Sequence, residues 1–273
     1  MSKETIVIPP DSETQESVSE SASEEKSIVL ARDVLPETLP VIPLYDRPMF
    51  PKMMGPLIID NAEMQKALLS EDTDTSSLYL GLIMTRQAKD GLHHVALDSE
   101  DFHTVGVTAK AIKIIPPSPG MPLQILVQVL KRFNVTEISS QGPVFQVRVQ
   151  YWPETEFDTN EELKAYSVAI VDSIRELVQL NPLFKEGLGL LLEKINVNDP
   201  GSLADFSASM TTADGAELQK ILETDSIRNR IEKALILLKR EIEISKLKVK
   251  ITKRIEERLS KQQRNFFLKE QLK

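Results

Sequence analysis

The sequence predicts an α+β protein in which an antiparallel, partly closed β-sheet is followed by a helical bundle and one long C-terminal helix. Three observations support this fold class. Residues 39–152 consist of short apolar runs separated by turn residues, which is typical of strands. After residue 153 the apolar residues recur at the three-to-four spacing of amphipathic helices. Residues 226–273 contain neither glycine nor proline, so nothing in them interrupts a helix.

Residues 1–36 are predicted to form a disordered tail rich in serine and acidic residues. They carry 3 lysines and arginines against 8 aspartates and glutamates, and their apolar residues are sparse. So little apolar surface does not offset the entropy that a chain loses when it becomes ordered. We therefore expect the folded part to begin near residue 37.

Residues 37–155 are predicted to hold roughly six strands, a typical number for one sheet. No helix of crossover length separates them, which favours antiparallel pairing. The first run, LPVIPL at 39–44, contains two prolines that lack amide donors, so we expect it at or beside a sheet edge. A short helix is expected at 61–69, with Asp60 or Asn61 as its cap. The apolar runs are 39–44, 56–59, 78–85, 104–115, 123–129, 132–138 and 144–151.

Residues 156–225 predict a small bundle of short helices. The first helix has apolar residues at helical spacing over 163–177. Asn181-Pro182 and Asp199-Pro200 each combine a capping side chain with a first-turn proline, which predicts a second and a third helix. Thr212 is expected to open a fourth helix.

The last segment, residues 226–273, is predicted to be one helix with Asp225 as its cap. About 48 residues at 1.5 Å each reach roughly 70 Å, more than a compact domain needs. The segment is basic, with 15 lysines and arginines against 6 acidic residues. We interpret it as a solvated connector rather than a nucleic-acid site, because only Phe266-Phe267 supplies the aromatic residues that bind single strands. Its two apolar stripes are Ile227, Ile231, Ala234, Leu238 and Ile242, then Leu247, Ile251, Ile255 and Leu259.

No catalytic, cofactor-binding or metal-binding residue is predicted. The chain has no cysteine, which excludes thiolate nucleophiles and cysteine zinc sites and fits a reducing cytoplasm. It has no nucleophile elbow and no phosphate-binding loop. His93, His94 and His103 match no helix-borne zinc motif and are interpreted as part of a solvated loop. Without a signal, a transit peptide or a membrane-spanning apolar run, we expect a cytoplasmic protein.

One segment rich in methionine, phenylalanine and proline supplies candidate substrate contacts, namely Tyr45, Met49, Phe50, Met53 and Met54. If exposed, such flexible apolar side chains form an adaptable surface for unfolded polypeptide. If buried, these side chains are part of the core or protect the edge of a strand. Because apolar residues lie mostly inside proteins, the sequence alone favours the core interpretation.

Three blocks of sequence, taken in their order along the chain, are more specific than the composition. They are LPVIPL at 39–44 with Phe50-Pro51, VGVTAKAI at 105–112 with Lys131-Arg132-Phe133, and DPGSLAD at 199–205 leading to QRNFFLKEQL at 263–272. Over about residues 37–273, they resemble the amino-terminal region of the Lon family of ATP-dependent proteases. Tyr45, where that family usually has arginine, and the less acidic Asn265-Phe266-Phe267 depart from the family pattern.

The resemblance implies a PUA-like β pseudo-barrel over residues 37–155, a helical subdomain over 156–225 and a long helix over 226–273. The full enzyme is implied to be a homo-hexamer that unfolds proteins with ATP and Mg and cleaves them with a Ser-Lys dyad. Those motifs are expected beyond Lys273, so this segment is expected to be non-enzymatic and to hold no cofactor. Its uncapped end within a helix suggests a truncated chain.

The implied function is substrate recognition and assembly for a protease that degrades misfolded, damaged and regulatory proteins. The expected partners are unfolded or damaged proteins and further copies of the chain, with no membrane. Two alternatives stay open. One is a nucleic-acid-binding PUA-like module, although residues 37–225 carry 15 basic against 27 acidic residues, which repels phosphate. The other is a purely structural oligomerisation element.

Overall fold

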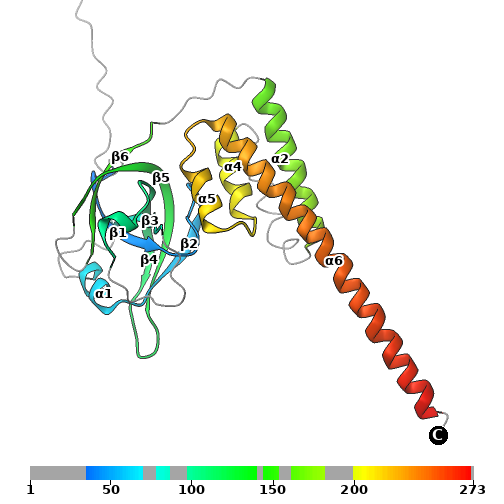
Figure 1. The fold of residues 1–273 in the computed structure, drawn as a ribbon. Helices are drawn as coiled ribbons and strands as arrows, with labels where there is room; N and C mark the ends of the chain where they lie inside the picture. The colour runs from blue at the N-terminus through cyan, green and yellow to red at the C-terminus, as the bar shows by residue number, and fades with distance from the viewer. Residues whose placement is uncertain are drawn as a thin grey trace, which may run out of the picture. The chain divides into compact units, whose positions relative to one another are not determined.

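The strands form a sheet that closes on itself (Figure 1). The computed structural model describes residues 35–69, 78–86, 97–139, 144–153, 161–181 and 199–271. Within these ranges the strand order is β2-β5-β4-β3-β1-β6, and β6 also pairs with β5. Five strands therefore make a ring, and β2 lies outside it against β5. The strands are β1 (Thr38–Leu44), β2 (Met54–Ile59), β3 (Tyr79–Met84), β4 (Val105–Ile115), β5 (Leu123–Ser139) and β6 (Gln146–Tyr151).

One strand pair in the barrel is parallel. β1 and β3 run in the same direction, with Val41 opposite Gly81 and Leu44 opposite Met84. The other pairs among the described strands are antiparallel, as predicted. A parallel neighbour needs a long connection, and the chain supplies one because it passes through β2 and the helix α1 (Ala62–Leu68) before β3. The sheet is therefore mixed.

The proline-containing strand β1 is not at an edge of the sheet, which corrects the prediction made from its sequence. Residues 38–40 pair with β6, and residues 41–44 pair with β3. Each half of β1 pairs with a different strand, so each set of inter-strand hydrogen bonds requires only some of the amide donors of β1. Pro40 and Pro43 are tolerated for this reason.

β5 is one continuous strand of 17 residues where two shorter strands were predicted. It pairs with β2 through residues 123–128 and with β6 through residues 133–139. Register shifts in its pairing with β4, between Val107 and Ala109 and between Ala111 and Lys113, allow the sheet to bend. The same strand therefore closes the ring and carries β2.

The helical part follows the barrel in the sequence. It comprises α2 (Glu161–Leu180), α4 (Pro200–Ser209), α5 (Gly215–Leu222) and α6 (Ile227–Gln271). Asn61 caps α1 and Asp199 caps α4, as expected. The predicted tail and the predicted helix after Pro182 lie outside the described residues.

Two predicted caps are wrong. The cap of α5 is Asp214, whose side chain accepts a bond from the amide of Glu217. Thr212 instead donates its amide and hydroxyl to Glu241 on α6, at 2.7 and 2.6 Å. α6 starts after Ser226, whose hydroxyl accepts from the amide of Asn229. In both cases a side chain one to two residues away from the expected cap reaches the free amides.

α6 changes character along its length (Figure 1). Its first apolar stripe is buried from Ile231 to Ile242 and packs against α2 and α4. Beyond Ser245 every side chain that the structure describes is exposed, including the second stripe from Leu247 to Leu259. At 1.5 Å per residue, its 45 residues span roughly 68 Å. Both stripes and the long helix were predicted. Among the described residues, no helix is both long and apolar enough to cross a membrane.

Candidate functional site: an apolar face on the barrel

Large apolar side chains are exposed on one part of the barrel. Met54 and Ile58 of β2 are 57% and 61% exposed, and Ile112 and Ile115 of β4 are 49% and 42% exposed. Met121, in the hairpin between β4 and β5, is 53% exposed. We call these five residues the apolar face. Among the described residues of the barrel, the strongly exposed large apolar side chains all belong to it.

Strand register explains why these residues point outward together. Directly opposed residues of antiparallel strands share a side of the sheet. From β2 across β5 to β4, the outward rows are Ile58–Gln124–Ile115, Pro56–Leu126–Lys113 and Met54–Gln128–Lys110. The alternate residues Leu57, Ile125 and Val127 are buried in the core. The apolar face is therefore the outer side of a three-stranded segment whose inner side is core.

Two local irregularities extend this surface. The register shift between Ala111 and Lys113 leaves Ile112 without a partner in the ladder, and it lies exposed. The hairpin turns at Gly120, whose φ of 81° favours glycine, and the backbones of Ser118 and Met121 bond to each other in both directions. This tight turn holds Met121 at the end of the hairpin.

The apolar face is bordered on one side by the free edge of β2. Within the described part of the chain, β2 pairs with β5 and with no other strand. An unpaired strand edge bearing exposed apolar residues invites another chain, and proteins commonly limit such pairing with proline. Pro56 lies in the middle of β2 and removes one donor from it. The edge is therefore open to side-chain contacts while its main-chain pairing is weakened.

Only one of the five predicted substrate contacts belongs to the apolar face. Met54 lies on it, whereas Phe50 is 1% exposed and fills the core. Met49 and Met53 are half-buried and pack against that core. Tyr45 is half-buried too, and burial raises the pKa of its hydroxyl. Phe50 lies in the core, in keeping with the core interpretation that the sequence favours, and its role as a substrate contact stays a prediction.

Sequence reasoning missed Ile58, Ile112, Ile115 and Met121. The signal that was present is the run TAKAIKII at 108–115, which departs from strict alternation and so places apolar residues on both sides of β4. Which of these residues are exposed depends on the register shift in β4, and the sequence of a single strand does not specify that shift.

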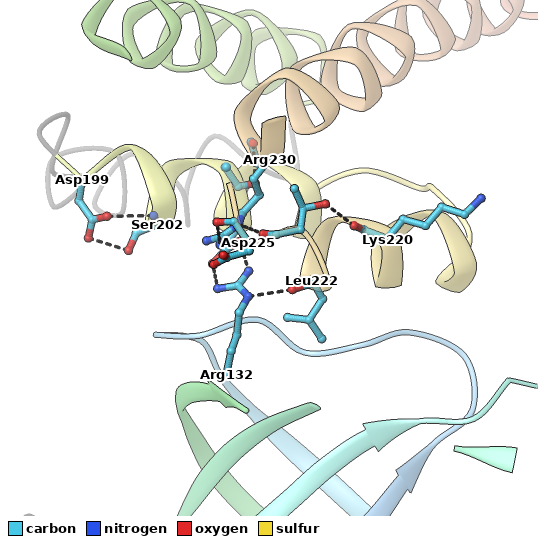
Figure 2. A network of polar contacts seen from close by, with 11 residues as sticks. Arg132, Asp199, Ser202, Lys220, Leu222, Asp225 and Arg230 are labelled. Atoms are coloured by element: carbon cyan, nitrogen blue, oxygen red, sulfur yellow. Dashed lines mark hydrogen bonds and ion pairs between the residues drawn. The ribbon is translucent and has the colours of Figure 1, made fainter. Parts of the chain in front are cut away.

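A buried polar network fixes the barrel to the helices (Figure 2). Arg132 of β5 donates to both carboxylate oxygens of Asp205 on α4, at 2.8 and 2.6 Å, and to the carbonyl of Leu222 at 3.0 Å. Arg230 of α6 donates to the carbonyls of Thr224 and Asp225. Burial, together with the nearby charge of Arg132, lowers the pKa of Arg230 to about 10. Two buried guanidinium groups thus lie beside one buried carboxylate.

The histidines do not form a metal site in the part of the chain that the structure describes. His103 has its Nδ1 atom 2.8 Å from the Oε1 atom of Glu223, which links the barrel to the end of α5. His93 and His94 lie outside the described residues. Among the described residues, no three histidine, aspartate or glutamate side chains gather closely enough to hold a metal ion.

Comparison with known proteins decides the family. A family model described as the ATP-dependent protease La (LON) substrate-binding domain matches residues 38–240, which include the whole apolar face. The chain belongs to the Lon family. The resemblance carried by the three sequence blocks is therefore confirmed.

The relatives of this Lon-family chain are longer proteins. Lon protease 1 of Syntrophotalea carbinolica is 42% identical over 265 residues, which cover 97% of this chain and 31% of that protein. The Lon protease of Chlamydia pneumoniae is 37% identical over 267 residues, which cover 98% and 32%. The chain thus spans about a third of the length of the curated relatives it matches.

Solved structures agree on the fold. The N-terminal domain of a Mycobacterium avium complex Lon protease superposes with a TM-score of 0.55 at 19% identity, over 74% of this chain and 98% of that one. The Lon N-terminal domain protein from Xanthomonas campestris gives a TM-score of 0.50 at 14% identity, over 73% and 97%. The predicted α+β pseudo-barrel with helices is confirmed by these matches.

Proposed function

We propose that this chain is the substrate-recognition region of a Lon-type ATP-dependent serine protease, and that the apolar face binds exposed apolar segments of misfolded or damaged proteins. The observation that carries the proposal is the gathering of five exposed apolar side chains on the β2, β5 and β4 segment, beside the free edge of β2. Folded proteins bury such segments, so affinity for them separates damaged from intact proteins. ATP hydrolysis and peptide cleavage are assigned to other parts of the longer, cytoplasmic enzyme.

The apolar face is suited to weak capture. Complete burial of a large apolar side chain contributes about 1.5 to 3 kcal/mol, so five half-exposed side chains contribute roughly 4 to 7 kcal/mol. Association itself costs about 4 kcal/mol or more. The difference, at most about 3 kcal/mol, corresponds to a dissociation constant in the millimolar range for one segment. Weak binding allows a client to be released to the unfolding machinery.

Fluorescence anisotropy tests this function directly. A labelled, permanently unfolded protein is titrated with the chain, and its folded form is the control. We expect binding of the unfolded form alone, weakened severalfold by the double change Ile58→Ser and Ile115→Ser. The matched control is Ile236→Ser, because Ile236 is 67% exposed but lies on α6. Equal binding of folded and unfolded forms, or an equal loss in the control variant, would refute the assignment.

The exposed part of α6 supports a second role in assembly. Leu247, Ile251, Ile255 and Leu259 recur every fourth residue and are each about half exposed. A solvated helix with such a stripe commonly packs against another helix. We propose that this stripe helps hold copies of the enzyme together, in the hexamer that the family resemblance implies. Sedimentation velocity of the wild type and of Ile255→Glu tests this, and an identical distribution for both would exclude it.

A further inference from the structure

The segments that form the apolar face carry charges of one sign. Residues 105–131, which run from β4 through the hairpin into β5, contain three lysines and neither aspartate nor glutamate. β2 contains no charged residue. This contrasts with residues 37–225 as a whole, which carry 15 basic against 27 acidic residues. These segments are therefore a local exception in an acidic body, and the exposed carboxylate of Asp60 follows directly after β2.

Two of these lysines belong to the outward rows. Lys113 lies in the row with Pro56 and Leu126, and Lys110 lies in the row with Met54 and Gln128. Lys113 is exposed, and Lys110 is half-exposed with its Nζ atom 5.7 Å from the centroid of the Tyr79 ring. Among the described residues, no carboxylate lies within 4.0 Å of either ammonium group. Lys113 is therefore open to a bound chain, whereas the ammonium group of Lys110 must be shared with the Tyr79 ring.

The spacing of the rows defines what these lysines fit. Neighbouring rows are two residues apart along β2, which is about 7 Å at 3.3 to 3.4 Å per residue. An extended client has the same repeat. Two carboxylates two residues apart can therefore approach Lys110 and Lys113, while neighbouring apolar side chains contact Met54, Ile58 and Ile115.

We propose that the apolar face selects extended polypeptide segments in which aspartate or glutamate is interleaved with apolar residues. This inference rests on the proposed capture function and specifies its preferred substrate. An apolar segment bearing lysine or arginine is disfavoured, because like charges would face each other on the same surface. Charge also raises the rate of encounter, since the lysines attract acidic segments before contact.

Three synthetic peptides of equal length test the preference. They share one set of apolar residues and carry glutamate, glutamine or lysine at two positions separated by one residue. Each exposed ion pair contributes about 0.2 to 1 kcal/mol, so with two pairs the glutamate peptide is expected to bind about two- to thirtyfold more tightly than the glutamine peptide in low salt. The lysine peptide is expected to bind most weakly. Raising the salt concentration should reduce these differences.

Variants assign the effect to the two lysines. The double change Lys110→Gln and Lys113→Gln should make the glutamate and glutamine peptides bind alike, and binding of the glutamine peptide should persist. The matched control is Lys248→Gln with Lys250→Gln, two exposed lysines on α6, which should leave the preference intact. A thermal melt of each variant verifies that it is folded.

The outcomes separate this inference from the proposed function. If glutamate and glutamine peptides bind equally well and both lose affinity in Ile58→Ser with Ile115→Ser, the charge preference is refuted while capture stands. If no peptide binds, the proposed function fails and this inference fails with it. Displacement of the glutamate peptide by a short single-stranded RNA at equal concentration would refute the polypeptide assignment, because the lysines would then serve phosphates.

Discussion

Arg132 and Asp205 lie 73 residues apart in the sequence and form a two-bond ion pair in which the side chains are 7% and 4% exposed. One partner belongs to β5 of the barrel and the other to α4 of the helical part. A bidentate pair fixes orientation as well as distance, because the planar guanidinium matches both carboxylate oxygens. This contact therefore sets how the barrel, with its apolar face, is held on the helices.

The change Asp205→Asn should lower the free energy of unfolding by about 3 to 5 kcal/mol, because it leaves the buried charge of Arg132 without a carboxylate. Arg230 lies in the same network and adds to the uncompensated charge. Urea denaturation followed by circular dichroism measures the change. The control is Glu217→Gln on the exposed pair with Arg240, where a loss of no more than about 1 kcal/mol is expected. Equal losses in the two variants would contradict this account.

Asp199 should make stability depend on pH in the acid range. Burial raises the pKa of its carboxyl group, but hydrogen bonds from Lys52 and Ser202 outweigh burial and hold that pKa below its usual value of 3.8. The stabilisation is thus present above about pH 4 and is lost as the pH falls through the lowered pKa. Asparagine also caps helices. The variant Asp199→Asn should therefore fold, with a urea midpoint that changes less between pH 5 and 3 than that of the wild type.

Gly106 is expected to tolerate no side chain. A Cβ atom there would lie 2.7 Å from the backbone oxygen of Leu82 and 2.8 Å from the Cζ atom of Phe133. Overpacking of this kind costs about 1 to 3 kcal/mol, and backbone atoms relieve it poorly. We expect Gly106→Ala to lower the melting temperature clearly. Gly81→Ala is the control, since its nearest contact is 3.3 Å; an equally large effect there would point to strand propensity instead.

Two isoleucines of α6 should respond differently to the same change. Ile242 is 2% exposed, so Ile242→Ala should destabilise the fold by about 2 to 5 kcal/mol. Ile255 is 51% exposed, so Ile255→Ala should change stability by about 0.5 kcal/mol or less. Chemical denaturation at low protein concentration distinguishes the two. A large loss for Ile255→Ala under those conditions would show that its stripe is covered within one chain.

Local patterns predict the elements of this fold better than they predict which strands pair. The lack of glycine and proline over residues 226–273 predicts α6, and Asp199 followed by Pro200 predicts the start of α4. Pro40 and Pro43 suggested a strand at or beside an edge, but β1 pairs with β6 along its first half and with β3 along its second half. The residues of a single strand do not reveal such a change of neighbour. The prediction of two strands where β5 is continuous has the same cause, because the two halves of β5 pair with different strands.

The apolar face illustrates the same limit at the site. Met54 was identifiable as apolar and near a turn, but its exposure depends on its pairing with Gln128. Phe50, four residues earlier, looks equally suitable in sequence and lies in the core. Ile58 and Ile115 are 57 positions apart in the chain and become neighbours only across Gln124. A surface assembled from three strands is a property of register, which no single segment specifies.

The uninterrupted course of α6 fixes a rotational angle between its two apolar stripes. Each helical residue turns the chain by about 100° and advances it by 1.5 Å. One residue inserted after Lys246 would therefore turn the stripe at Leu247, Ile251 and Ile255 by about 100° relative to the buried stripe, with almost no change in length. Seven inserted residues would nearly restore the angle but move the stripe about 10 Å outward. Any partner of this stripe is thus held at a defined azimuth about the helix axis, and a single insertion would turn it toward a different side of the barrel.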